Sequence, residues 1–169
     1  MGKGNVQEVR FCGNRIGRGG ASALAASLPT MTGIVRVDVS RCRLGDAGIK
    51  ILFPSLAECS HLQDLNLSRN EISSVGGEEV GEHLNRCPAL EILDLSWNAI
   101  RGKGSSVIGE SLRSNRTIES LNLKWNNIGA DCGFDNWAGF FDENETLTRR
   151  VASICKSIVD QLGTLRTAG

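Results

Sequence analysis

The sequence predicts an α/β solenoid shaped as a horseshoe, with a parallel β-sheet on the concave face and α-helices on the convex face. Three observations support this class. Similar segments recur every 28 residues, each segment opens with alternating apolar residues, and each then changes to a helical spacing of three and four. We expect about five copies, which begin at Val6, Ile34, Leu62, Leu90 and Ile118.

The first part of each copy predicts a short strand. Residues 62–72 follow the spacing LxxLxLxxNxL, and the same spacing returns at 90–100 and 118–128. Apolar side chains two residues apart give a strand one buried face, and the next copy adds a parallel strand at about 4.8 Å. The first two copies follow the pattern more loosely, with valine or phenylalanine in place of leucine at Val9, Phe11, Val37 and Val39.

An amide or thiol side chain follows each strand at one fixed position. An asparagine amide both donates and accepts hydrogen bonds, so it can satisfy backbone groups in the bend after the strand and continue as a ladder between copies. A thiol makes a weaker version of the same bonds. We expect this structural ladder to consist of Asn14, Cys42, Asn70, Asn98 and Asn126.

The second half of each copy predicts a helix that returns the chain to the next strand. Glycine recurs where the chain turns into the helix, at Gly20, Gly48, Gly76 and Gly104. Leucine recurs near the helix end on its inward face, at Leu28, Leu56, Leu84 and Leu112. Strand, bend, helix and return together fill each copy.

These features resemble the ribonuclease-inhibitor-type subfamily of leucine-rich repeats, in which a strand alternates with a full α-helix and one position is Asn or Cys. The resemblance extends from Val6 to Thr146. It implies a fold rather than one function, because the family includes nuclease inhibitors, innate-immune sensors, a GTPase-activating protein and many centrosomal and ciliary proteins. The amino-acid sequences of residues 93–98 and 121–127 are most similar to those of the centrosomal and ciliary members.

The repeat pattern ends near residue 146, which divides the chain into a repeat domain, residues 1–146, and a C-terminal segment, residues 147–169. Arg150 would place a charge in the core of a sixth copy. Apolar residues from Val151 to Leu165 instead recur at spacings of three and four, which predicts an amphipathic helix. This helix either caps the fifth repeat or docks on a partner. A further alternative is that the chain is a fragment or an altered reading frame of a longer repeat protein, with a tail after Leu147 that is foreign to the family.

The N-terminal end lacks a capping segment, because only residues 1–5 precede the first strand. Val6, Val9 and Phe11 would therefore border an open sheet edge and an open core. We expect another chain, or a second copy of this one, to cover them.

Composition argues against nucleic-acid and membrane partners. The formal net charge is zero at pH 7, with 22% charged and 40% apolar residues, so no excess of positive charge favours a polyanion. No stretch reaches the roughly 18 apolar residues of a membrane span, and no signal segment follows Met1. We expect a cytoplasmic protein, with the cytoskeleton or the cilium implied by the resemblance.

Chemistry-bearing residues do not assemble into a catalytic or metal site. His61 and His83 have no carboxylate or cysteine at metal-ligand spacing, and neither is expected on the strand face where a triad would form. Cys59 and Cys87 lie in neighbouring helix ends, beyond the roughly 7 Å Cα separation of a disulfide, and are expected to be reduced packing residues. We therefore expect no enzyme activity and no cofactor.

Recognition is expected at positions that vary between copies, because positions that agree serve the fold. The position just before the ladder holds Gly13 and then Arg41, Arg69, Trp97 and Trp125, which we call the Arg–Trp column. Trp and Arg are enriched at binding hot spots, and neighbours about 5 Å apart can also stack or form cation–π contacts. Alternatively, the tryptophans lie flat on the bend and shield the asparagine ladder.

Further candidates for partner contact come from the outward strand positions and from a late loop. The strand positions alternate in charge, which suits a specific polar partner, and the loop from Asp131 to Glu145 is acidic and aromatic. These candidates are Arg36, Asp38, Asp64, Asp94, Lys124, Trp137, Phe140 and Phe141.

We therefore expect a non-catalytic protein–protein interaction module, a scaffold or adaptor within a cytoskeletal, centrosomal or ciliary assembly. The alternative is a regulatory inhibitor or activator of an enzyme, as some members of the family are. A ribonuclease inhibitor needs a strongly acidic concave face, and the net charge of zero and five copies count against it.

Overall fold

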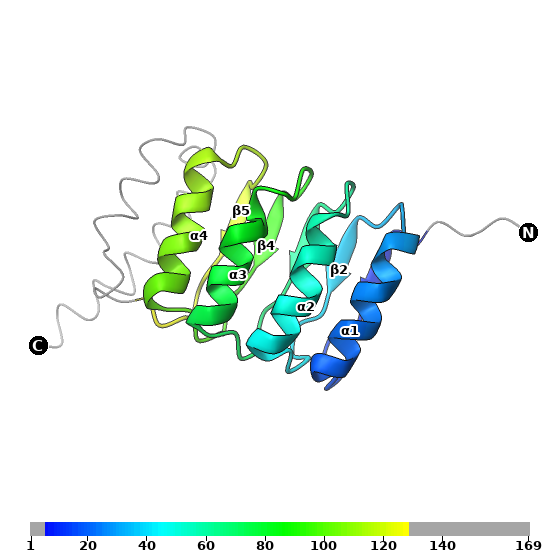
Figure 1. The fold of residues 1–169 in the computed structure, drawn as a ribbon, viewed down its shortest axis with the longest axis horizontal. Helices are drawn as coiled ribbons and strands as arrows, with labels where there is room; N and C mark the ends of the chain where they lie inside the picture. Colours follow the sequence, from blue (N-terminus) through cyan, green and yellow to red (C-terminus); the bar gives the residue numbers. More distant parts are fainter. Residues whose placement is uncertain (1–5, 129–169) are drawn as a thin grey trace, which may run out of the picture.

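The computed structural model describes residues 6–128, and within them the predicted α/β solenoid is confirmed (Figure 1). The strands are β1 (Glu8–Arg10), β2 (Arg36–Asp38), β3 (Asp64–Asn66), β4 (Ile92–Asp94) and β5 (Ser120–Asn122). The helices are α1 (Gly17–Ser27), the short 3-10 helix η1 (Leu28–Thr30), α2 (Gly45–Ala57), α3 (Ser74–Leu84) and α4 (Gly102–Ser114). The expected C-terminal helix lies outside the described residues.

The sheet is parallel and follows sequence order, β1-β2-β3-β4-β5. Glu8 pairs with Arg36, which pairs with Asp64, so equivalent residues of successive copies face each other 28 residues apart. The helices lie side by side on one face of this sheet (Figure 1). The other face presents exposed side chains such as Arg36 and Ile92.

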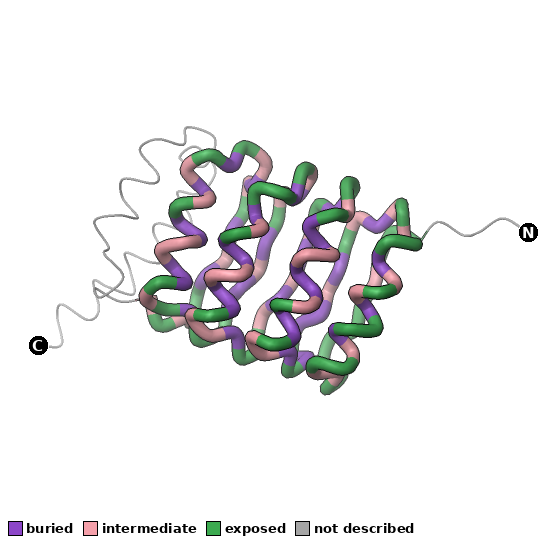
Figure 2. Tube along the Cα trace, viewed as in Figure 1, coloured by how far each residue is buried: buried purple, intermediate pink, exposed green. Residues whose placement is uncertain are grey.

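The core lies between the sheet and the helices, where the tube in Figure 2 is buried. The central residue of each strand from β2 to β5 is at most 1% exposed: Val37, Leu65, Leu93 and Leu121. Four helix leucines complete this layer with the same low exposure: Leu28, Leu56, Leu84 and Leu112. Burial of one such side chain stabilises the fold by about 1.5–3 kcal/mol.

The recurrent glycines have a packing role that differs from the expected one. Gly104 lies inside α4, and a Cβ there would come within 2.3 Å of the Ser74 carbonyl oxygen at the start of α3. Gly81 in α3 is similarly close to Val107 of α4, at 2.7 Å. These glycines let α3 and α4 approach each other, while left-handed φ angles occur at Gly17, Gly45 and Gly102 instead.

Candidate partner-binding surface

The asparagine ladder is present, and each amide links its own copy to the preceding one. Asn70 accepts hydrogen bonds from the amides of Cys42 (2.9 Å) and Leu44 (3.3 Å), and it donates to the carbonyls of Val39 and Leu67. Asn98 repeats the pattern one copy later, and Asn126 accepts from Ile100 and donates to Leu95 and Leu123. Asn70 is fully buried by these contacts.

The two N-terminal ladder positions differ from the other three. Cys42 is buried, and its thiol donates to the carbonyls of Phe11 (3.1 Å) and Ser40 (3.4 Å), the weaker bonds expected of a cysteine. Asn14 is exposed, and its side-chain amide donates to Phe11 within its own bend at 3.0 Å. Because each amide bonds toward the preceding copy, Asn14 carries less of the ladder than the sequence pattern suggested.

The Arg–Trp column lies one residue before the ladder and has a left-handed backbone. The φ angles are +56° for Arg41, +58° for Arg69, +56° for Trp97 and +60° for Trp125, and Gly13 has +79° in the same column. Glycine adopts this conformation freely, whereas a residue with a Cβ is disfavoured by about 1–2 kcal/mol. The bend geometry therefore explains Gly13 but not the four large side chains.

Regular backbone hydrogen bonds hold the column in place. The amides of column residues donate to carbonyls of the next copy, from Gly13 to Ser40 (2.9 Å), from Arg41 to Ser68 (2.9 Å) and from Arg69 to Ser96 (3.0 Å). The same bond joins Trp97 to Lys124 at 2.8 Å. The side chains of the Arg–Trp column therefore extend from a hydrogen-bonded backbone and follow one another at the spacing of the strands.

Three members of the column form one continuous stack. The guanidinium carbon of Arg69 lies 4.1 Å from the centre of the Trp97 ring, and the rings of Trp97 and Trp125 stack with centroids 4.6 Å apart and planes 19° apart. The expected cation–π and stacking contacts are therefore confirmed. Trp97 and Trp125 remain 43% and 59% exposed, an unusual exposure for the largest apolar side chains.

The last residue of each strand from β2 to β5 has a local role that sequence comparison did not reveal. Asp38 accepts a hydrogen bond from the amide of Ser40 at 2.9 Å, and Asp94 accepts one from Ser96 at 2.8 Å. Asn66 and Asn122 make the same bond to the residue two positions later. Asp and Asn alternate at this position because either side chain can supply the acceptor oxygen.

A polar hollow of about 350 Å³ lies on the strand face over the first three strands. It is lined by Glu8, Arg10, Arg36, Val37, Asp38, Asp64 and Asn66. Two ion pairs lie among these residues. Arg10 pairs with Glu8 of the same strand at 2.6 Å, and Arg36 pairs with Asp64 of the next strand at 3.8 Å. The opposite charges predicted for this face therefore neutralise each other in part.

Asp64 is the perturbed acid of this face. Its partial burial raises the pKa above the ordinary value, and the Arg36 guanidinium acts in the opposite direction. The carboxylates of Asp38, Glu8 and Asp94 raise the pKa further. A positive group brought by a partner would relieve this repulsion.

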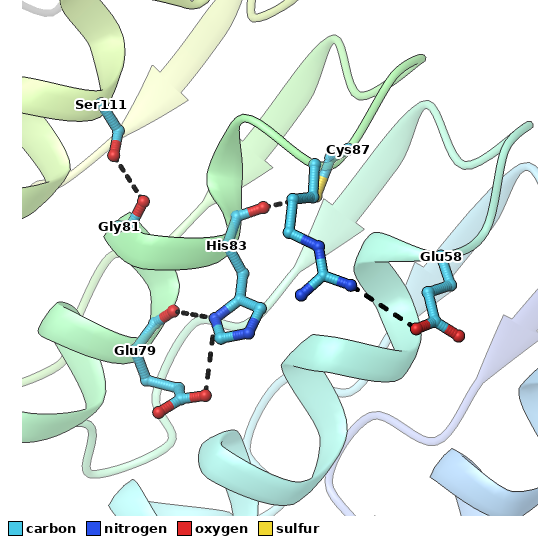
Figure 3. Close-up of polar contacts among 7 residues, drawn as sticks. Glu58, Glu79, Gly81, His83, Cys87 and Ser111 are labelled. Atoms are coloured by element: carbon cyan, nitrogen blue, oxygen red, sulfur yellow. Dashed lines mark hydrogen bonds and ion pairs between the residues drawn. The ribbon is translucent and has the colours of Figure 1, made fainter.

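Polar contacts on the helix side are local (Figure 3). His83 is largely enclosed, with a side chain 18% exposed, and its Nδ1 lies 3.0 Å from the Glu79 carbonyl and 3.5 Å from the Glu79 carboxylate. Cys87 donates to the His83 carbonyl, and Ser111 donates to the Gly81 carbonyl. These bonds join helix ends and neighbouring helices, so they have a structural role.

Cysteines 12, 42, 59 and 87 are free thiols. Burial raises the pKa of Cys87 to about 12, and the neighbouring Cys59 adds to this effect. Within residues 6–128, no three His, Cys, Asp or Glu side chains gather where they could hold a metal ion. Over the same part of the chain, the helices lack the length and apolar character needed to cross a bilayer.

The remaining predicted residues are Lys124 and three aromatic residues of the late loop. Lys124 lies beside Trp125 and is exposed. Trp137, Phe140 and Phe141 lie outside the described residues. The structure thus brings Arg69, Trp97 and Trp125 together and places Arg36 and Asp64 on the adjoining strand face.

Comparison with known proteins agrees with this architecture. A family profile described as "Leucine Rich repeat" matches residues 58–81, 86–109 and 114–131. A structure described as "Leiomodin-1 Actin-Binding Site 2 (ABS2)" aligns with a TM-score of 0.68 and 18% identity, over 96% of this chain and 89% of that one. The tropomodulin C-terminal domain of Caenorhabditis elegans aligns with a TM-score of 0.66 and 14% identity, over 88% and 99%.

A search of curated protein sequences finds no match. At such low identities the structural likeness establishes the fold, and the repeat matches agree with it. The chain therefore has the leucine-rich-repeat fold. The profile leaves out the first two strands, where the sequence follows the repeat most loosely.

Proposed function

We propose that this chain is a non-catalytic protein–protein interaction module, a scaffold or adaptor in a larger cytoplasmic assembly of the cytoskeleton, centrosome or cilium. We propose also that its repeats are of the ribonuclease-inhibitor type, which is supported by the full α-helix in each 28-residue copy from β1 to α4. The structural likeness to an actin-binding site of leiomodin-1 and to tropomodulin supports a cytoskeletal partner.

The observation that carries this proposal is the exposed stack of Arg69, Trp97 and Trp125. These side chains occupy left-handed positions where the fold favours glycine, so the bend alone does not account for them. Rigid, partly exposed Trp and Arg side chains are the residue types that dominate binding energy at protein interfaces.

The size of the surface requires contributions beyond the sheet. Five strands at about 4.8 Å spacing give a face roughly 24 Å across, while a stable interface buries about 800 Å² on each partner. Three-residue strands cannot supply that area alone. We propose that the Arg–Trp column, the outward strand side chains Arg36 and Asp64, and Lys124 in the bend after β5 act as one surface.

The N-terminal face is the second proposed contact. Val6 and Phe11 are 45% and 39% exposed, whereas residues equivalent to Phe11 in later copies, such as Leu67 and Leu95, are fully buried. An apolar hollow of about 230 Å³ adjoins Phe11, lined also by Ile16, Gly20, Ala23, Leu24, Ser27 and Met31. We propose that another chain or a second copy covers it.

The test is co-sedimentation of the full chain with purified actin filaments and, separately, with microtubules. Binding to one of them is expected, with affinity reduced at least tenfold in Trp97→Ala/Trp125→Ala. Lys50→Ala, an exposed change on α2, is the matched control and should bind as wild type. Binding to neither polymer contradicts a direct filament contact, and equal binding by the double variant contradicts the role of the column.

Regulation of an enzyme is the second candidate, favoured by the four carboxylates on the strand face. Glu8, Asp38, Asp64 and Asp94 outnumber Arg10 and Arg36 there. Inhibition of a purified basic ribonuclease, or acceleration of GTP hydrolysis by a purified small GTPase, would favour this candidate over the scaffold role.

A further inference from the structure

Charge is distributed unevenly between the two ends of the strands. We define the strand-to-helix rim as residues 11–16, 39–44, 67–73, 95–101 and 123–128. The rim has one acidic residue, Glu71, and six basic residues: Arg15, Arg41, Arg43, Arg69, Arg101 and Lys124. The helix-to-strand loops hold three acidic residues, Glu58, Glu91 and Glu119, against Arg86 and Arg116. The neutral chain thus has a rim with a net of five positive charges.

We infer that this rim binds an acidic segment of a partner protein. In that segment two neighbouring carboxylates contact Arg41 and Arg69, and an adjacent apolar side chain lies against Trp97 and Trp125. This inference rests on the proposed protein-binding function and adds the chemistry of the partner.

Arg41 and Arg69 form the proposed carboxylate site. Their backbones lie on adjacent copies, joined by the bond from the Arg41 amide to Ser68, so their Cα atoms are about one strand spacing apart and both guanidinium groups extend from the same rim. Among residues 6–128, neither has a carboxylate within ion-pair distance, whereas the nearby Arg43 pairs with Glu71. Like charges at this spacing repel each other, and a carboxylate bound between them would offset that repulsion.

Arg69 is already oriented for such a ligand. Its guanidinium carbon lies over the Trp97 ring, 4.1 Å from the ring centre, so the ring covers one face of the guanidinium group. The N–H donors lie in the plane, so they remain available for a bidentate bond to a carboxylate. Because the stack fixes the side chain in advance, less conformational entropy is lost on binding.

The two tryptophans define the rest of the segment. From Arg41 to Trp125 the column spans three strand spacings, about 14 Å, which matches four or five extended residues. Trp97 and Trp125 are partly exposed and lie at the end of the column opposite Arg41. A segment with paired acids next to a leucine or an aromatic residue fits this order.

A protein segment fits the surface better than single-stranded nucleic acid. Both could use arginines and stacked aromatic rings. However, Asp38, Asp64 and Asp94 lie on the strand face that adjoins the rim, and would repel a phosphate backbone. In a polypeptide, basic residues on either side of the acidic segment can face these carboxylates.

The experiment selects random twelve-residue peptides, displayed on phage, against the full chain, and then measures binding of the enriched peptides by fluorescence anisotropy. We expect enrichment of peptides with two adjacent acids beside an apolar residue. Their affinity should fall at least tenfold in Arg41→Glu/Arg69→Glu, and should return when lysines replace the two peptide acids. Arg18→Glu/Lys50→Glu, with the same change in net charge on α1 and α2, should bind the original peptides as wild type.

Selected peptides without acidic residues, or equal binding to Arg41→Glu/Arg69→Glu, would overturn the inference. A labelled twenty-nucleotide oligouridine that binds more tightly than any selected peptide, and loses binding in the same variant, would also overturn it. Filament binding that needs Trp97 and Trp125 but is insensitive to the arginine changes would leave the proposed function standing while rejecting the acidic partner.

Discussion

The asparagine ladder and the Arg–Trp column are neighbours in sequence, but from the third copy onward they differ in their side-chain contacts. Asn70 is fully buried and hydrogen-bonded to two copies, while Arg69 beside it is exposed and stacked on a tryptophan. Asn98 and Trp97 repeat the contrast. Adjacent residues of one bend therefore have different roles: the ladder residue stabilises the fold, and the column residue is available for recognition.

The largest expected effect is on the ladder. Asn70→Ala leaves the amides of Cys42 and Leu44 and the carbonyls of Val39 and Leu67 without this partner. Buried groups left unsatisfied cost about 1–3 kcal/mol each, so the free energy of unfolding should fall by about 3 kcal/mol or more.

Asn14→Ala is the matched control for that measurement by urea denaturation. Asn14 is exposed and bonds only within its own bend, so a loss below about 1 kcal/mol is expected. Similar losses in the two variants would show that the ladder does not depend on the preceding copy.

In the Arg–Trp column we expect a smaller change in the free energy of unfolding, and one of opposite sign. Arg41→Gly removes the left-handed strain at φ +56°, so the free energy of unfolding should rise by about 0.5–1 kcal/mol, after the greater unfolded-state entropy of glycine is subtracted.

The reverse change, Gly13→Ala, has no steric obstacle within 4 Å and should lower the same quantity by about 1 kcal/mol. Thermal or urea unfolding of both variants checks the pair. A destabilised Arg41→Gly would indicate that Arg41 serves the fold after all.

The smallest effect concerns Asp64 on the strand face. Its raised pKa means that the folded chain binds the proton more tightly than the unfolded chain. The contribution of Asp64 to the free energy of unfolding therefore falls as pH rises through the folded pKa. Asp64→Asn should therefore be more stable than wild type at pH 7, with the gain vanishing below the ordinary aspartate pKa. The exposed Arg36 pair opposes this only weakly. Unfolding curves at several pH values check it, and a gain that grows toward low pH would be contradictory.

Thiol reactivity offers a separate check on burial. Cys12 is exposed, whereas the pKa of Cys87 is raised to about 12. At pH 8 an alkylating reagent should modify Cys12 much faster than Cys87, because the thiolate is the reactive form. Peptide mapping by mass spectrometry measures both rates, and equal rates would show that the helix ends open readily.

The sequence was sufficient for the parts of the fold that repeat. Apolar positions such as Leu65 and Leu93 recur with the period of a strand, and the asparagines recur with the ladder. The same comparison predicted contact between Arg69 and Trp97, because equivalent residues of adjacent copies must lie one strand spacing apart.

Other features could not be inferred by comparing equivalent positions of the five copies. A comparison of copies classes Asp38 and Asp94 as variable, yet they share with Asn66 the ability to accept a hydrogen bond from the backbone amide two residues later. The left-handed conformation of the column had one signal in the sequence, the glycine at Gly13. The role of Gly104 depends on how closely two helices pack, which no single copy encodes.

The most direct test combines stability and binding in Trp97→Ala/Trp125→Ala. The two side chains are about half exposed and touch each other, so the free energy of unfolding should fall by less than about 2 kcal/mol, while filament binding falls at least tenfold. A variant that binds as wild type, or one that loses as much stability as Asn70→Ala, would contradict the division between ladder and column.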